Sequence, residues 1–134
     1  MIRVLEIRIL KFAIVAATAF GLASCTTDVS ARHGLDRAAV KEMVAREAVN
    51  MGVPVSLALA VAHAESNFNP KAESHKGARG VMQIMPATAA GEYGIRAERL
   101  WDPRLNIRLG LHFLGRLVKR YRGRVDLALS YYNG

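Results

Sequence analysis

The most restrictive feature of the sequence is a segment, residues 55–65, that is apolar on nearly every side. It reads VSLALAVAHAE, is rich in alanine and ends in one carboxylate, Glu65. A helix that is apolar all round is typical of the interior of a fold. Pro54 stands where proline opens a helix, at its first position. The segment therefore predicts a central helix, and the rest of the chain must supply the elements that pack around it.

Apolar residues at helical spacing continue on both sides of this segment. Before it, Asp36 is expected to cap the start of a helix and Gly52 to close its end. After it, Pro86 is expected to start a short helix over residues 87–93. A last helix is expected to begin near Val125 and to be running still at Tyr132. These signals divide most of the chain into helices of ordinary length.

A longer helix is predicted after Asp102-Pro103, a pair that combines an N-cap with a first-turn proline. Its apolar face has period 3.6 and consists of Ile107, Leu111, Leu114, Val118 and Tyr121. Residues 66–80, by contrast, are rich in Asn, Pro, Ser and Gly and predict a structured loop. The sequence shows no alternating strand pattern and no repeat. The expected fold class is all-α, or mainly α with a minor β-hairpin in the 66–80 loop.

The N-terminal residues have the pattern of a bacterial export signal. Arg3, Arg8 and Lys11 precede an uncharged, mostly apolar run over residues 12–23. This run is too short for a membrane-spanning helix, which needs about 20 apolar residues, and it fits the apolar core of a signal peptide. The sequence then continues Leu22-Ala23-Ser24-Cys25, which resembles the lipobox of bacterial lipoproteins.

The lipobox predicts three consequences for the start of the chain. Residues 1–24 would be a signal peptide, Cys25 would carry the lipid anchor, and residues 25–34 would be a polar tether. Thr26 follows the cysteine where an Asp favours the inner membrane, which implies the outer membrane. The alternative is ordinary signal cleavage and release into the periplasm without an anchor.

Composition excludes several kinds of site. The sequence has 134 residues, which indicates one domain, and one cysteine, which excludes an internal disulfide and a multi-cysteine zinc site. The segment His63-Ala64-Glu65 fits the His-x-Glu of zinc deaminases but lacks their cysteine partners. The four histidines show no ligand spacing, so we expect no metal and no cofactor.

The formal charge of +8 favours an anionic partner. Nucleic acid is the first candidate from charge alone, but the bases are scattered and an exported chain rarely meets chromosomal DNA. The one modest cluster, Arg116 to Arg124, is expected to be a solvated face or one that meets an anionic polymer or lipid.

Glu65 is the residue with the clearest chemical potential. The negative end of the helix dipole and the apolar residues one turn back, Val61 and Ala62, both disfavour its charged form. A carboxyl that stays protonated near neutral pH suits general-acid cleavage of a glycosidic bond. The residues alone leave open the commoner case, a solvated Glu at a helix end.

Four blocks of the sequence, in order, resemble the catalytic domain of soluble lytic transglycosylases. The blocks are Glu65-Ser66-x-Phe68-x-Pro70, then Ser74-x-x-Gly77-Ala78-x-Gly80-Val81-Met82-Gln83-Ile84-Met85-Pro86, then Asp102-Pro103-x-x-Asn106-Ile107-x-x-Gly110, and finally Ala128-Leu129-x-x-Tyr132-Asn133. The resemblance runs from about Val40 to Gly134. It implies a lysozyme-like fold over residues 35–134 that acts on bacterial peptidoglycan as a monomer.

The resemblance also implies a mechanism with Glu65 as the sole catalytic carboxylate. Glu73 and Glu92 match no catalytic position of the family. Glu65 would protonate the oxygen between N-acetylmuramic acid and N-acetylglucosamine while the 2-acetamido group stabilises C1. As a base, it would then take the proton of the C6 hydroxyl, which attacks C1. The product would be a 1,6-anhydro end, formed without water; substrate-assisted glycosidases similarly need no second carboxylate.

The resemblance assigns substrate-binding roles to six further residues: Ser74, Met82, Gln83, Met85, Tyr132 and Asn133. Gln83 would bind sugar polar groups, Ser74 would lie near the substrate, and Met82 and Met85 would floor the cleft. The Tyr132 hydroxyl would lie near the catalytic carboxyl and Asn133 near the acetamido sugar. Each also has a structural alternative: a surface amide for Gln83, a turn for Ser74, and core packing for the methionines and Tyr132.

Two rival functions stay open from the sequence. One is a hydrolytic muramidase on the same fold, and the other is a non-catalytic wall-binding or envelope-assembly lipoprotein. The family pattern continues beyond its Tyr-Asn block, and Gly134 stands where Ala is common, so we expect the C-terminal part of the domain to be incomplete.

Overall fold

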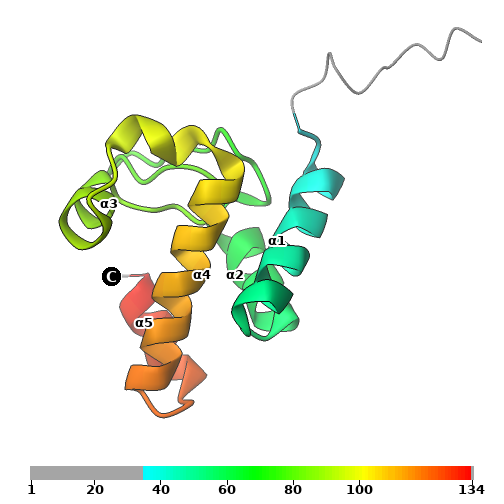
Figure 1. Ribbon diagram of the computed structural model, residues 1–134, viewed down its shortest axis with the longest axis vertical. Helices are drawn as coiled ribbons and strands as arrows, with labels where there is room; N and C mark the ends of the chain where they lie inside the picture. The colour runs from blue at the N-terminus through cyan, green and yellow to red at the C-terminus, as the bar shows by residue number, and fades with distance from the viewer. Residues whose placement is uncertain (1–34, 134) are drawn as a thin grey trace, which may run out of the picture.

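A computed structural model describes residues 35–133 of the chain (Figure 1). It consists of α1 (Arg37–Met51), α2 (Val55–Ser66), α3 (Pro86–Tyr93), the 3₁₀ helix η2 (Ala97–Trp101), α4 (Pro103–Arg120) and α5 (Val125–Tyr132). Helix α4 lies in the middle, with α1 and α2 on one side and α3 and α5 on the other. The all-α expectation is confirmed. The predicted signal peptide, Cys25 and the 25–34 tether lie outside the described residues.

The helix ends follow the capping residues of the sequence. Asp36 accepts a hydrogen bond from the Ala39 amide at 2.7 Å and so starts α1, and Gly52 ends it in the left-handed conformation. Asp102 caps α4 in the same way, through the Leu105 amide at 3.1 Å. Pro54 precedes α2 as its N-cap instead of occupying the predicted first helical position.

The core is built where α1 packs against α2 and α4. Val40, Val44 and Ala48 of α1 are fully buried. Helix α4 contributes a wider buried stripe than the predicted face, consisting of Asn106, Ile107, Leu109, Gly110, Leu111, Leu114 and Leu117. The long helix is therefore the element against which the rest of the described chain is organised.

The prediction that α2 is central is right for one side of this helix only. Ala58, Val61 and Ala62 are buried, whereas Ala60 and Ala64 are exposed. Alanine presents little apolar area, so its exposure to water costs little free energy. Among the described residues, the packed side of α2 is the one that faces α1.

The segment between α2 and α3 is a structured loop, as predicted. Within residues 35–133 it forms isolated antiparallel bridges, Glu73 with Arg79 and Arg79 with Ile84, and no strand. The alternative of a β-hairpin is therefore reduced to these bridges. The 3₁₀ helix η2 was not predicted, because its five residues are too few to show a period.

Candidate active site

Glu65 lies in the last turn of α2, where the chain leaves the helix for the loop. The helix ends because Asn67 and Phe68 both adopt positive φ angles, 50° and 60°. Phe68 is buried, so this sharp exit turns the chain back onto the core. Glu65 itself is only partly exposed, and burial raises the pKa of its carboxyl above the ordinary value. The direction agrees with the prediction from the sequence.

Ser66, the residue after Glu65, ties the end of α2 to the loop. Its hydroxyl donates to the carbonyl of Val81 at 2.7 Å and lies 3.3 Å from the carbonyl of Ala62. A serine hydroxyl has a single proton, so the shorter contact is the better hydrogen bond. Through it, the loop residues that follow Val81 are held against the helix that carries Glu65.

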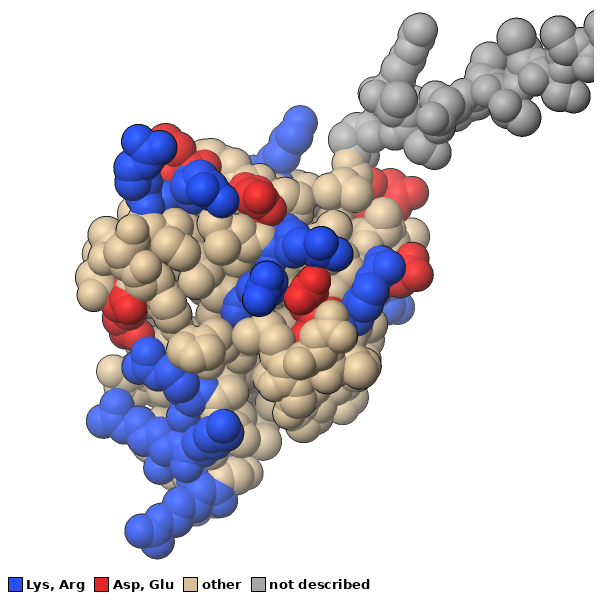
Figure 2. Space-filling view, in the orientation of Figure 1, with Lys and Arg blue, Asp and Glu red and all other residues tan. Residues whose placement is uncertain are grey.

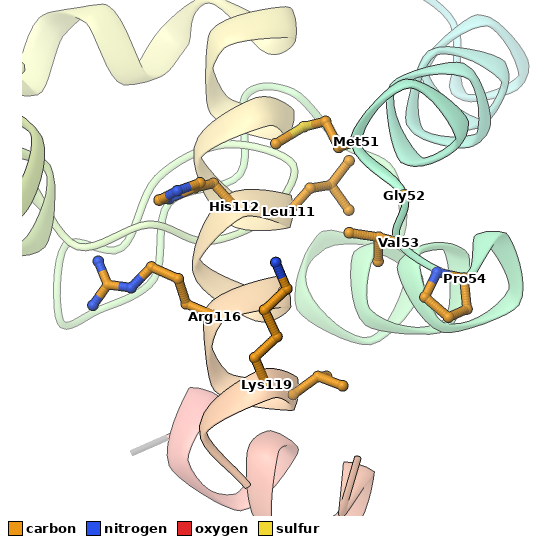
Figure 3. Close-up of a pocket in the computed structure, with 10 residues that line it drawn as sticks. Met51, Gly52, Val53, Pro54, Leu111, His112, Arg116 and Lys119 are labelled. Carbon is orange, nitrogen blue, oxygen red and sulfur yellow. The ribbon is translucent and has the colours of Figure 1, made fainter. Parts of the chain in front are cut away.

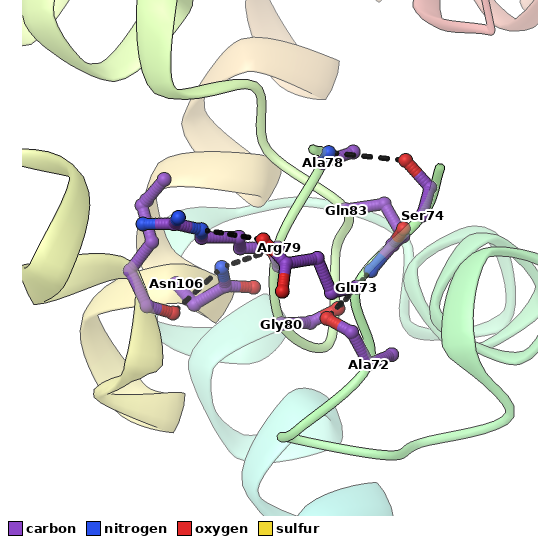
Figure 4. A network of polar contacts seen from close by, with 9 residues as sticks. Ala72, Glu73, Ser74, Ala78, Arg79, Gly80, Gln83 and Asn106 are labelled. Carbon is purple, nitrogen blue, oxygen red and sulfur yellow. Dashed lines mark hydrogen bonds and ion pairs between the residues drawn. The ribbon is translucent and has the colours of Figure 1, made fainter. Parts of the chain in front are cut away.

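Asn106 of α4 holds the other side of the same loop. Its side chain accepts a hydrogen bond from the Met82 amide at 2.8 Å. It donates to the carbonyl of Arg79 at 2.7 Å (Figure 4) and to that of Leu100 at 3.1 Å. Asn106 is fully buried. Gly80 permits this arrangement, because a Cβ there would collide with the Asn106 amide. One buried side chain thus joins the loop, η2 and α4.

The two polar loop residues that the sequence singled out also make contacts inside the loop (Figure 4). The Gln83 amide nitrogen donates to the carbonyls of Gly80 at 2.9 Å and Ala72 at 3.2 Å, and Gln83 has a φ of 47°. The Ser74 hydroxyl accepts from the Ala78 amide at 3.0 Å. Both side chains therefore shape the loop, and their predicted contacts with a sugar stay predictions.

Tyr132 reaches this loop from α5. Its hydroxyl donates to the Met82 carbonyl at 2.9 Å, and its ring lies 5.5 Å from that of Phe113. Burial raises the pKa of Tyr132 far above its usual range, and the negative charge of Glu65 adds to the shift. The structure thus brings Tyr132 and Glu65, which are far apart in the sequence, into electrostatic contact.

The remaining predicted residues differ in what they can offer to a ligand. The Met82 side chain has no exposed surface and packs against Gly110 so closely that a Cβ there would collide with it. It can therefore support a cleft only from beneath. Met85, at 38% exposure, and Asn133 are open to solvent.

The acids that could assist Glu65 are engaged elsewhere. Glu73 pairs with Arg79 at 3.1 Å, and Glu92 pairs with Arg116 at 2.8 Å. Within residues 35–133 there is no group of three His, Cys, Asp or Glu side chains that could hold a metal ion. Glu65 is therefore the carboxyl for which the described part of the chain provides a partly buried and unpaired setting.

Sequence reasoning assigned no role to Asn106, although it lies in the third block. The sequence does contain a signal for a structural role of Asn106. An asparagine on the apolar face of an amphipathic helix is buried, so its amide needs hydrogen-bond partners inside the protein. Its three partners come from three segments, and only the fold shows which ones they are.

A separate pocket lies between the α1–α2 turn and α4 (Figure 3). It has a volume of about 390 Å³, and Val53, His112 and Lys119 are among its lining residues. Pro54, which also lines it, is at the opposite end of α2 from Glu65. The pocket therefore does not belong to the candidate active site.

Comparisons with known proteins give a consistent result. Residues 42–134 match the family model described as "Transglycosylase SLT domain". The chain is 37% identical over 117 residues to "Membrane-bound lytic murein transglycosylase C" of Edwardsiella ictaluri, covering 80% of this chain and 32% of that protein. It is 34% identical over 88 residues to "Soluble lytic murein transglycosylase" of Escherichia coli, covering 60% of this chain and 14% of that protein. The chain thus spans a third or less of these relatives.

Two solved structures share the fold. An inactive Glu-to-Gln mutant of the lytic transglycosylase Slt from Pseudomonas aeruginosa has a TM-score of 0.62 and 35% identity, covering 70% of this chain and 16% of that one. The 70 kDa soluble lytic transglycosylase from Escherichia coli has a TM-score of 0.62 and 32% identity, covering 69% and 16%. The lysozyme-like expectation is confirmed by these neighbours. Because the family model covers more than half of the sequence, this chain belongs to the transglycosylase SLT domain family.

Proposed function

We propose that this chain is a peptidoglycan lytic transglycosylase that cleaves the bond between N-acetylmuramic acid and N-acetylglucosamine without water. Glu65 acts first as the acid that protonates the glycosidic oxygen. It then acts as the base that accepts the C6 hydroxyl proton, as that hydroxyl closes a 1,6-anhydro ring on C1. The names of the relatives, lytic murein transglycosylases, support this substrate class.

The observation that carries the proposal is the setting of Glu65. A general acid must hold its proton at working pH, and burial raises the pKa of this carboxyl in that direction. The same side chain stays partly exposed, so a substrate oxygen can reach it. The raised pKa favours the protonated form that the first step needs, and the carboxylate left by that step is the base for the second.

The pairing of the other acids supports a mechanism with one carboxylate. A retaining glycosidase places two carboxyl groups about 5–5.5 Å apart. Glu73 and Glu92 are instead held by Arg79 and Arg116. The acetamido group of the substrate can supply the stabilisation at C1 that a second carboxylate would otherwise give.

The loop and α5 form the proposed substrate-binding surface around this acid. Met85 offers exposed apolar surface for a sugar ring, and Asn133 offers an exposed amide. Gln83 and Ser74 would present the polar atoms that their loop contacts leave free. Tyr132 fixes the Met82 carbonyl and so positions the loop beside Glu65.

The decisive experiment replaces Glu65 with Gln in the full chain and analyses the soluble products from purified sacculi. We expect the unmodified chain to release muropeptides with 1,6-anhydro ends, and Glu65→Gln to release none while keeping its far-UV circular dichroism spectrum. The inactive Glu-to-Gln mutant of the P. aeruginosa relative motivates this substitution. Glu73→Gln and Glu92→Gln are the matched controls and should stay active.

Each other outcome of this experiment identifies a different function. Reducing ends in place of anhydro ends would identify a hydrolytic muramidase. Sedimentation with sacculi without any release of muropeptides would identify a non-catalytic wall-binding lipoprotein. Turnover by the Glu65→Gln variant would contradict the assignment of the catalytic acid.

We also propose that Cys25 anchors the chain to the periplasmic face of the outer membrane. The lipobox supports the modification, and Thr26 after the cysteine favours the outer membrane. The name of the Edwardsiella relative, a membrane-bound lytic murein transglycosylase, supports attachment to a membrane. Within residues 35–133, no helix is both long and apolar enough to cross a membrane. Labelling with a radioactive fatty acid tests the anchor: the label should enter the unmodified chain and not the Cys25→Ser variant.

A further inference from the structure

The C-terminal end of α4 and the turn that follows it carry a dense group of exposed cations, here called the basic tip. Figure 2 shows Lys and Arg side chains gathered at this end of the molecule. The tip consists of Arg116, Lys119, Arg120, Arg122 and Arg124, all of them exposed. Five cations within nine residues form a strongly positive surface.

Carboxylates neutralise only part of this charge. Arg116 pairs with Glu92 at 2.8 Å, and Arg124 pairs with Asp126 at 2.7 Å. The other three cations of the tip make no ion pair within the part of the chain that the structure describes. They therefore remain available to an anion from outside.

The backbone of the tip is held in a defined turn. The Gly123 amide donates to the Val118 carbonyl at 2.9 Å and the Arg124 amide to the Tyr121 carbonyl at 3.0 Å. Arg122 adopts a φ of 52°, which is uncommon for a residue with a side chain. The turn thus spreads its cations from fixed backbone positions, and their long side chains can adapt to a ligand.

Two adjoining hollows extend from the tip to Tyr132, a residue of the proposed substrate-binding surface. The first is lined by Tyr132, and the second by Lys119 and Arg120; both share Glu92, Phe113 and Tyr131 as walls. A polymer bound beside Tyr132 could therefore continue along α4 and α5 to the basic tip. The aromatic walls suit sugar rings, and the cations beyond them suit negative charges.

The tip also lies far from the point where the described chain begins. The described chain begins toward the upper end of the molecule in Figure 1, and the α4–α5 turn lies at the lower end. The 18 residues of α4 alone extend about 27 Å between these ends.

We propose that the basic tip is a second binding site for peptidoglycan, which holds the carboxylates of the peptide side chains while the glycan strand occupies the site at Glu65. This inference rests on the proposed function and names a further part of the same substrate, its peptide side chains. Guanidinium and ammonium groups recognise carboxylates by charge-assisted hydrogen bonds. The tip would increase the residence time on the wall without taking part in bond cleavage.

The test compares two triple variants of the full chain in a Glu65→Gln background, where no substrate is consumed. The first carries Lys119→Gln, Arg120→Gln and Arg122→Gln. The control carries Arg37→Gln, Lys41→Gln and Arg46→Gln, three exposed bases of α1. We expect sedimentation with purified sacculi to weaken about tenfold in the first at low salt, and to change less than about twofold in the control. Added NaCl should remove the difference.

Two further measurements identify the ligand. Sacculi whose peptides have been removed by an amidase should bind both triple variants equally. At the same low salt, removal of the tip should weaken binding to vesicles of anionic phospholipid less than it weakens binding to intact sacculi. A tip-dependent affinity for the vesicles alone, or equal binding of the two variants to intact sacculi, would overturn the proposal.

Catalytic assays separate this inference from the proposed function. With Glu65 restored, the tip variant should cleave peptide-free glycan strands at the rate of the unmodified chain and intact sacculi more slowly. Loss of activity on the peptide-free strands would show that the tip belongs to the active site and would overturn the proposal. Absence of anhydro products from the unmodified chain would instead contradict the proposed function and leave the binding result standing.

Discussion

The loop of residues 72–84 and the basic tip both connect helices, but they use polar side chains in opposite ways. In the loop, Ser74 and Gln83 bond to backbone groups, and Asn106 enters from α4 to bond three more. In the tip, the cations are exposed and so are their two ion pairs, and Arg120 lies over the ring of Tyr131 at 5.6 Å. Removal of a buried hydrogen bond leaves a costly unsatisfied group, whereas exposed charges are screened. The loop can therefore hold a fixed shape beside Glu65, while the tip is free for recognition.

The largest expected effect in this comparison comes from Asn106→Leu. The variant leaves the Met82 amide and the carbonyls of Arg79 and Leu100 without their partner. We expect the free energy of unfolding to fall by about 3–5 kcal/mol, because each unsatisfied buried group costs about 1–3 kcal/mol. Urea denaturation followed by circular dichroism measures the loss.

Asn69→Leu is the control for this substitution. Asn69 is exposed and accepts one hydrogen bond, from the Lys71 amide at 3.0 Å. The Asn69→Leu substitution should lower the free energy of unfolding by about 1 kcal/mol or less. Equal losses for the two variants would show that Asn106 is not the anchor of the loop.

A smaller effect is expected from Gly110→Ala in α4. The added Cβ would collide with the Met82 side chain. This crowding should lower the free energy of unfolding by about 1–3 kcal/mol. Gly115→Ala in the same helix is the control, since its Cβ would meet Val53 at an ordinary 3.7 Å. The free energy of unfolding of Gly115→Ala should rise by up to about 1 kcal/mol, because alanine has a higher helix propensity than glycine. Thermal unfolding of both variants tests the difference; a stable Gly110→Ala protein would contradict the close packing.

The sequence predicted the helices well because their limits depend on local signals. Asp36, Gly52, Asp102 and Pro86 act within their own turns, so α1, α3 and α4 begin or end where expected. The exposed side of α2 could not be predicted, because it depends on which elements pack nearby. An apolar pattern on all sides of a helix indicates that burial would be favourable. It does not indicate which element of the described chain would cover each side.

The candidate site likewise has features that neighbouring residues predict and contacts that only the fold reveals. The position of Glu65 at a helix end and its raised pKa follow from neighbours in the sequence. The hydrogen bond from Tyr132 to Met82 and the contacts of Asn106 join residues that are distant in the chain, and only the fold reveals them. The resemblance marked these positions without giving the physical reason for them.

Tyr132→Phe should have a smaller effect on stability than the two core changes. It removes the hydroxyl that donates to the Met82 carbonyl at 2.9 Å and keeps the ring beside Phe113. We expect a loss of about 1 kcal/mol, the net value of one hydrogen bond, together with slower release of muropeptides. Urea denaturation and product release measure the two effects. Tyr131→Phe, at a 51% exposed neighbour, is the control for stability and should leave the free energy of unfolding unchanged.

The ionisation of Glu65 should give a modest dependence of stability on pH. Burial raises the pKa of this carboxyl in the folded protein, so folding favours its protonated form. Its contribution to stability is complete below the pKa of the unfolded carboxyl and is lost as the pH rises through the folded pKa. Glu65→Gln should therefore gain stability relative to the unmodified chain as the pH rises above the unfolded-state pKa of about 4.3.

Melting temperatures at several pH values test this sign. Glu42→Gln, at an exposed carboxylate of α1, controls for the loss of one charge. A relative loss of stability by Glu65→Gln with rising pH would mean that a cation, and not burial, dominates the surroundings of Glu65.

The smallest expected effect is on the stability of the basic tip. Replacement of Lys119, Arg120 and Arg122 with Gln breaks no ion pair of the described structure and removes three neighbouring like charges. The free energy of unfolding should change by less than about 0.5 kcal/mol per site, with a slight gain at low salt. Urea denaturation at two NaCl concentrations measures it. A loss of several kcal/mol would mean that the tip, like the loop, is structural, and the contrast between the two regions would disappear.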